Sequence, residues 1–106
     1  MIAKKVIVRG HVQEVGFRYF TKQLADKLGV TGVVWNASDG SVRIEAQADE
    51  TVMTDFVNEV KVSPSPYGRV DSVESEIIPV DKSRRVFKAD LIRYTILLIC
   101  WWNGDG

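Results

Sequence analysis

The chain has 106 residues, of which 45% are hydrophobic, and this is enough for one domain with one modest core but too little for two. Lys and Arg together number 14, as do Asp and Glu, so no net charge draws the chain to nucleic acid or to an anionic membrane. The longest apolar run, 94–102, is shorter than the roughly 20 residues that a membrane-spanning helix needs. We therefore expect no membrane segment. The chain has a single cysteine, Cys100, and its N-terminus lacks a long apolar segment, and these features predict a cytoplasmic protein.

The first half of the chain predicts a strand, a helix and a hairpin. A short β-branched stretch ends at Gly10, which is the pattern of a strand that runs into a turn. Apolar residues then recur at helical spacing, and Gly29 is placed to end that helix. An Asp-Gly turn joins the next two strands, and strict alternation in the second of them predicts one buried face. The expected elements are strands at 4–9, 31–36 and 41–47 and a helix that begins near Phe17.

The second half predicts another helix and two more strands. Asp49 is placed to cap a helix whose apolar residues, from Val52 to Val60, share one face, and the SPSP sequence at 63–66 interrupts the chain after it. Residues 69–78 and 85–94 are strand-like. The order β-α-β-β-α-β with one extra strand is that of the α+β ferredoxin-like split βαβ sandwich, in which two helices cover one face of a mostly antiparallel sheet.

The stretch GHVQEVGFRYF at 10–20 contains a candidate anion site at the start of the first helix. Gly16 precedes the helix and offers no side-chain acceptor, so the unpaired N–H groups of the first turn are left available. Those groups, the positive end of the helix dipole and the guanidinium of Arg18 could together hold a phosphate. A glycine at a helix start and a solvated first-turn arginine are nevertheless common, so the residues alone favour a purely structural role. The spacings of Walker and dinucleotide-binding loops are absent.

The stretch GHVQEVGFRYFTKQLADKLGVTGVVWNASDGSV at 10–42 closely resembles the acylphosphatase signature. That signature reads G-x-V-Q-G-V-x-F-R and is followed by G-x-V-x-N-x-x-D-G-x-V, and the resemblance extends over roughly residues 4–94. It implies the ferredoxin-like fold and an enzyme that hydrolyses acyl phosphates, which are carboxyl-phosphate mixed anhydrides, to a carboxylate and inorganic phosphate without a metal or cofactor. We therefore expect an acylphosphatase-like domain at 1–94.

The resemblance also implies roles for individual residues. Arg18 would bind the phosphate, and Asn36 would orient the attacking water. The phosphate loop would be formed by the backbone amides of five successive residues, namely His11, Val12, Gln13, Glu14 and Val15.

Two of these residues, Asn36 and His11, and the neighbouring Trp35 have competing interpretations. Asn36 precedes a hairpin turn, where Asn is frequent for local reasons, and His11 is best read as a solvated loop histidine. Trp35 could stack on a base, because the ferredoxin-like sheet is also an RNA-recognition architecture. The RNP1 pattern is absent and the chain is neutral, so RNA binding is the weakest alternative.

The sequence departs from the signature at two places. Glu14 stands where the signature has glycine, and its carboxylate would oppose a bound phosphate, so the main alternative function is an anion- or partner-binding module with impaired catalysis. The second departure is the C-terminal extension at 95–106, which carries Ile96, Leu97, Trp101 and Trp102. We expect this apolar segment to be buried, either by folding back over the domain or by self-association with another copy.

Overall fold

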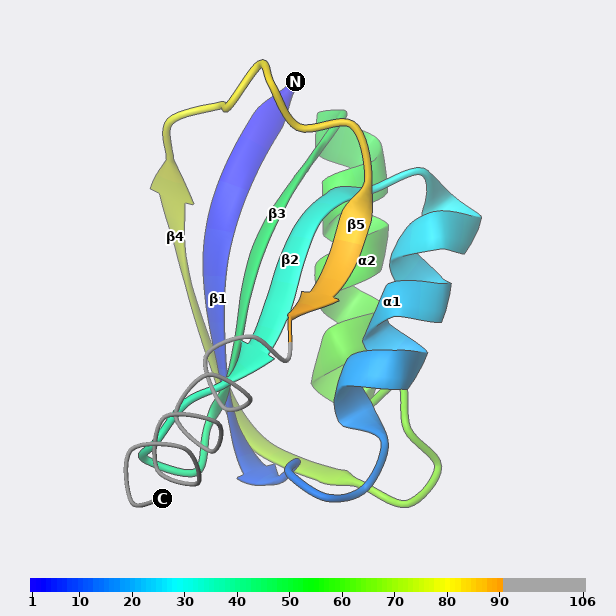
Figure 1. The fold of residues 1–106 in the computed structure, drawn as a ribbon, viewed down its shortest axis with the longest axis vertical. Coiled ribbons are helices and arrows are strands. Elements are labelled where there is room, and N and C mark those ends of the chain that lie inside the picture. The colour runs from blue at the N-terminus through cyan, green and yellow to red at the C-terminus, as the bar shows by residue number, and fades with distance from the viewer. Residues whose placement is uncertain (91–106) are drawn as a thin grey trace, which may run out of the picture.

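The computed structural model describes residues 1–90 and contains two helices packed on one face of a five-stranded sheet (Figure 1). This is the expected ferredoxin-like arrangement, and the element order matches the prediction. The elements are β1 (Ile2–His11), α1 (Phe17–Leu28), β2 (Thr31–Asn36), β3 (Val42–Ala48), α2 (Glu50–Val62), β4 (Arg69–Ile78) and β5 (Phe87–Asp90).

The strand order in the sheet is β4-β1-β3-β2-β5. β1 pairs antiparallel with β3 on one side and with β4 on the other, while β2 and β3 form the antiparallel hairpin. The extra strand, β5, adds to the outer edge of β2 in parallel, with Gly32 opposite Phe87. The first strand in sequence thus lies in the interior of the sheet, and its C-terminal end delivers the chain to the start of α1.

The core lies between the helices and the sheet, on the faces that the apolar spacing predicted. Val6 and Val8 of β1 and Ile44 of β3 are fully buried there, beneath the inward sides of both helices. Phe56 of α2 meets Phe87 of β5 edge to face, with ring centroids 6.1 Å apart. The β5 strand is therefore anchored in the same core as the other four strands.

Two details differ from the sequence expectation. The β1 strand extends to His11, because its ladder with β4 continues past a register shift after Arg9. Asp49 does occupy the N-cap position of α2, but its side chain accepts no hydrogen bond from the helix.

The polar face of β3 is less open than its alternation predicted. Gln47 is 5% exposed, because the connection from β4 to β5 crosses this side of the sheet (Figure 1). The Gln47 Nε2 donates to the carbonyl of Asp81 (2.8 Å), and the Asp81 amide donates back to Gln47 Oε1 (2.9 Å). Arg84 forms an ion pair with Glu45 at 2.7 Å on the same face.

Within residues 1–90, no helix is long and apolar enough to cross a membrane. The expectations for the end of the predicted last strand and for the apolar segment 95–106 concern residues outside this range.

Candidate functional site

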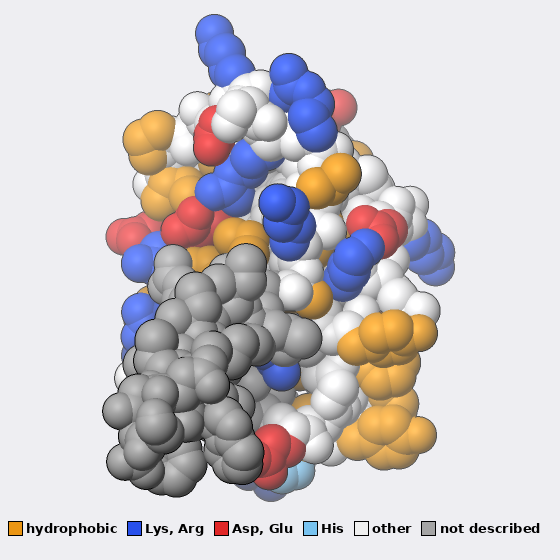
Figure 2. Space-filling view, viewed as in Figure 1, with side chains coloured by type: hydrophobic (Ala, Val, Ile, Leu, Met, Phe, Trp, Pro, Cys, Tyr) orange, Lys and Arg blue, Asp and Glu red, His pale blue; other side chains and the backbone are white. Residues whose placement is uncertain are grey.

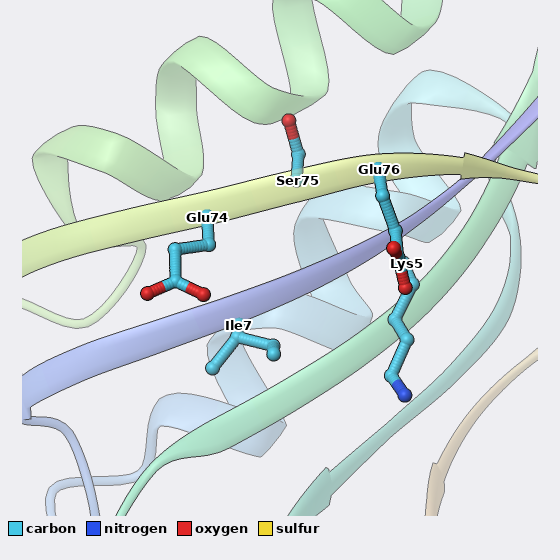
Figure 3. Close-up of a pocket in the computed structure, with 5 residues that line it drawn as sticks. All are labelled: Lys5, Ile7, Glu74, Ser75 and Glu76. Carbon is cyan, nitrogen blue, oxygen red and sulfur yellow. The ribbon is translucent and has the colours of Figure 1, made fainter.

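Two hollows in the described part of the molecule lack the features expected of a phosphate site. One lies beside the β4–β5 connection, where Lys and Arg side chains gather (blue at the top of Figure 2), but its Arg84 is already paired with Glu45. The other is a hollow of about 150 Å³ between β1 and β4 on the helix-free side of the sheet. Figure 3 shows Glu74 and Glu76 beside Lys5 and Ile7 there, so two carboxylates would oppose an anion.

The third hollow lies where β1 runs into α1 and where β2 ends, and its volume is about 300 Å³. Gly16 is the N-cap residue of α1, with φ 76°, and supplies no side-chain cap. The first intrahelical bond runs from the Phe20 amide to the Gly16 carbonyl (3.0 Å). No backbone amide of residues 12–16 donates to a protein acceptor in the part of the chain that the structure describes. Free amides at a helix N-terminus are suited to binding an anion.

This third hollow, which we call the α1 pocket, brings together four of the residues singled out in the sequence. Arg18 reaches it from the first turn of α1, and Asn36 reaches it from the last position of β2. Val12 and Glu14 border it from the loop between β1 and α1. The lining residues are Val12, Glu14, Gly16, Phe17, Arg18, Tyr19, Lys22, Asn36 and Ala89.

The other three predicted site residues lie beside the α1 pocket without lining it. His11 is the exposed last residue of β1, opposite Arg69, and Val15 is buried in the core. The Gln13 side chain points to the β2–β3 turn, where Nε2 donates to the carbonyls of Ala37 (2.8 Å) and Ser41 (2.9 Å). For these three residues the predicted phosphate contact is made by the backbone amide, so it does not require the side chain to line the pocket.

Glu14 has a backbone conformation that glycine adopts more readily than other residues. Its φ is 65°, in the left-handed region that favours glycine, and its side chain is exposed at the rim of the α1 pocket. The loop therefore keeps the turn that a glycine would make, and this turn carries a carboxylate.

The amide of Asn36 has an unused acceptor. Its Oδ1 is buried and has no hydrogen-bond partner among the described residues. A buried polar atom without a partner costs free energy, roughly 1–3 kcal/mol, and such atoms mark places where a bound water or ligand completes the structure. Asn36 is also one of the residues that line the α1 pocket.

The turn that follows Asn36 is held by several hydrogen bonds to Asp39. Asp39 Oδ1 accepts hydrogen bonds from the Ser41 amide (2.9 Å) and the Ser41 hydroxyl (2.5 Å), and its other oxygen accepts one from Arg43 (3.1 Å). Hydrogen bonding by Ser41, with a smaller contribution from Arg43, lowers the pKa of Asp39 to about 2. The turn is thus held by a carboxylate that stays ionised through the neutral range.

Sequence reasoning missed two side chains of the α1 pocket, Tyr19 and Lys22. Lys22 lies four residues after Arg18, a spacing that puts both cations on one helix face, and it also bonds Asp26 at 2.6 Å. Tyr19 is 57% exposed, and its ring meets that of Phe20 edge to face with ring centroids 5.3 Å apart. The helical spacing from Arg18 was an available signal for Lys22.

The loop between β1 and α1 is also fixed from a second side, which the sequence did not indicate. The Ser65 hydroxyl, from the segment after α2, is buried and donates to the Val15 carbonyl at 2.6 Å.

Residues 1–90 contain no group of three or more His, Cys, Asp or Glu side chains that could hold a metal ion.

Known proteins resemble this chain in sequence and in fold. The acylphosphatase family model matches residues 4–89. An acylphosphatase of Enterococcus faecalis is 52% identical over 81 residues, which cover 76% of this chain and 89% of that protein. One from Pediococcus pentosaceus is 56% identical over 71 residues, or 67% of this chain and 79% of that protein. The crystal structure of acylphosphatase from Bacillus subtilis superposes with a TM-score of 0.80 at 36% identity, covering 85% of this chain and 99% of that one. This chain therefore belongs to the acylphosphatase family.

Proposed function

We propose that the chain hydrolyses acyl phosphates in the α1 pocket, with Arg18 and the backbone amides of the 11–15 loop binding the phosphate and Asn36 positioning the attacking water. Membership of the acylphosphatase family supports the reaction itself. The observation that carries the residue roles is that one pocket joins a helix N-terminus without a side-chain cap, Arg18, and Asn36, whose Oδ1 has no hydrogen-bond partner among residues 1–90.

The chemistry suits so small a set of groups. An acyl phosphate is already activated, because its leaving group is a carboxylate, so no protein nucleophile is required. The amides and the Arg18 guanidinium hold the phosphate oxygens and balance their charge in the transition state. Asn36 fixes a water in line with the leaving carboxylate, which converts an encounter with solvent into a reaction within the complex. The products are a carboxylate and inorganic phosphate.

The comparisons do not favour the alternative of a binding module that has lost catalysis. The relatives of this chain at about 50% identity over most of its length are acylphosphatases. Glu14 then modulates the affinity of the pocket for phosphate without abolishing turnover. A cytoplasmic location, which the single cysteine favours, belongs to the same proposal.

Steady-state hydrolysis of benzoyl phosphate, with inorganic phosphate as a competitor, tests the proposal. Arg18→Ala should lower kcat/KM by about 10³-fold or more and weaken inhibition by phosphate, because both depend on the guanidinium. Asn36→Ala should lower kcat by about 10²-fold and leave the phosphate inhibition constant nearly unchanged. Arg85→Ala and Asn58→Ala, at exposed positions outside the pocket, are the matched controls. A wild-type rate in either site variant would refute the role given to that residue.

A further inference from the structure

The Gln13 side chain connects the two halves of the proposed site. Gln13 belongs to the loop before α1, while Ala37 and Ser41 flank the turn that follows β2. Both N–H bonds of the Gln13 amide are used in this connection, at 2.8 Å to the Ala37 carbonyl and 2.9 Å to that of Ser41. The proposed phosphate role of the loop uses only its backbone and gives this side chain nothing to do.

We propose that Gln13 is a positioning residue that sets Asn36 relative to the phosphate loop, an inference that rests on the function proposed above. Ala37, which Gln13 holds, is joined to Asn36 by one peptide bond. No protein hydrogen bond at Oδ1 fixes the Asn36 amide among the described residues, so its place depends on the backbone that carries it. A displacement of about 1 Å in the water that Asn36 orients is enough to slow an in-line reaction strongly.

The second brace of the loop allows the two effects to be separated. Ser65 holds the loop at the Val15 carbonyl, and this bond is buried and does not involve the β2–β3 turn. Without Gln13, the loop keeps the Ser65 brace and its ability to bind phosphate. Only the link between the loop and Asn36 is lost, so kcat should fall while the affinity for phosphate stays nearly constant.

Removing the Gln13 amide leaves the turn itself paired. The Ser41 carbonyl also accepts from the Ala37 amide (2.8 Å), and the Ala37 carbonyl also accepts from the Gly40 amide (3.2 Å). Neither acceptor is left without a partner, so we expect the variants to fold. Gln13→Ala removes the side chain, and Gln13→Met keeps its length without a donor.

A purely stabilising role for Gln13 has a matched control in Gln47. This glutamine makes the same kind of connection between two segments, through its two bonds with Asp81, but at the opposite end of the sheet. If bracing alone mattered, Gln47→Ala would reduce the melting temperature and the activity as much as Gln13→Ala does. We expect Gln47→Ala to lower the melting temperature and to leave kcat for benzoyl phosphate within about twofold of the native value at 25 °C.

The decisive experiment is a double-mutant cycle on kcat with Gln13 and Asn36. In the native background, Gln13→Ala and Gln13→Met should each lower kcat about tenfold or more, with the phosphate inhibition constant changed by less than about threefold. In the Asn36→Ala background, the same changes should have almost no further effect, because the group they position is gone.

The remaining outcomes would reject either the role of Gln13 or the role of Asn36. An equal loss of kcat in both backgrounds, or a loss no greater than that of Gln47→Ala, would reject the positioning role of Gln13 while leaving the proposed function intact. A native rate in Asn36→Ala alone would reject the proposed role of Asn36, and the positioning role would fall with it.

Discussion

Replacing Glu14 with glycine tests what the one substituted position of the signature costs this chain. A left-handed conformation, here φ 65°, costs an ordinary L-residue about 1–2 kcal/mol. Glycine avoids that strain but loses more conformational entropy on folding, and this loss cancels about 0.4–1 kcal/mol of the gain. The net gain in the free energy of unfolding is about 0.5–1 kcal/mol, so the melting temperature of Glu14→Gly should rise by about 3–6 °C.

The same substitution removes a negative charge at the rim of the α1 pocket. Because Glu14 is exposed, its repulsion of a phosphate acts through water, where two unit charges about 4 Å apart interact with about 1 kcal/mol. The inhibition constant for inorganic phosphate should therefore fall by up to about fivefold, and the difference should shrink with added salt.

Two further variants separate strain from charge at this position. Glu14→Gln removes the charge and keeps the strain, so it should lower the inhibition constant without raising the melting temperature. Glu14→Asn should also raise the melting temperature, since Asn tolerates the left-handed region better than Glu. The reasoning about charge is refuted if the native chain and Glu14→Gln have equal inhibition constants at low salt. The reasoning about strain is refuted if Glu14→Gly melts no higher than Glu14→Gln.

Three other predictions concern stability and can be checked by thermal unfolding. Gly32→Ala should prevent folding or lower stability severely, because the added Cβ would lie 1.8 Å from the Glu45 carbonyl oxygen. Gly40→Ala places its Cβ in open space and should cost only about 1 kcal/mol of unfolding free energy. Similar losses in the two variants would contradict this reasoning. The pKa of Asp39 is lower in the folded state, at about 2, than its ordinary value of 3.8, so the unfolded chain binds more protons between these values. The contribution of Asp39 is therefore present above pH 3.8 and lost as the pH falls through 2, so the melting temperatures of the native chain and Asp39→Asn should converge below pH 2; a gap that keeps its neutral-pH size below pH 2 would argue against it. Phe87→Ala should lower the free energy of unfolding by about 3 kcal/mol, since the ring is buried against Phe56, and a loss below 1 kcal/mol would show that β5 contributes little to the core.

Local signals were sufficient for most of the fold. The ends of α1 could be read from Gly16 and Gly29, since both adopt the left-handed conformation that glycine favours at helix ends. The apolar spacing identified the buried faces of both helices and of β3. The full length of β1 could not be read in this way, because its last residues are strand only through pairing with β4 far along the chain.

The candidate site, like the fold, was predictable only in part. The family resemblance pointed to Arg18 and Asn36, and both lie on one pocket. The contacts of Gln13 and Ser65 were not predictable, because each is a bond from a side chain to the backbone of a segment 24 to 50 residues away and leaves no spacing pattern. A serine between two prolines signals only a break in the chain.

The position of β1 between β3 and β4 has a consequence for how the molecule forms. Ala3 lies opposite Ile78, so the first strand made during synthesis acquires its second neighbour only after most of the chain exists. Closing so long a loop before its contacts form slows folding, and until then β1 exposes an unpaired edge that invites aggregation. The loop at the end of β1 likewise gains its Ser65 brace late. Recovery of enzymatic turnover after dilution from denaturant should therefore lag behind the recovery of helical signal.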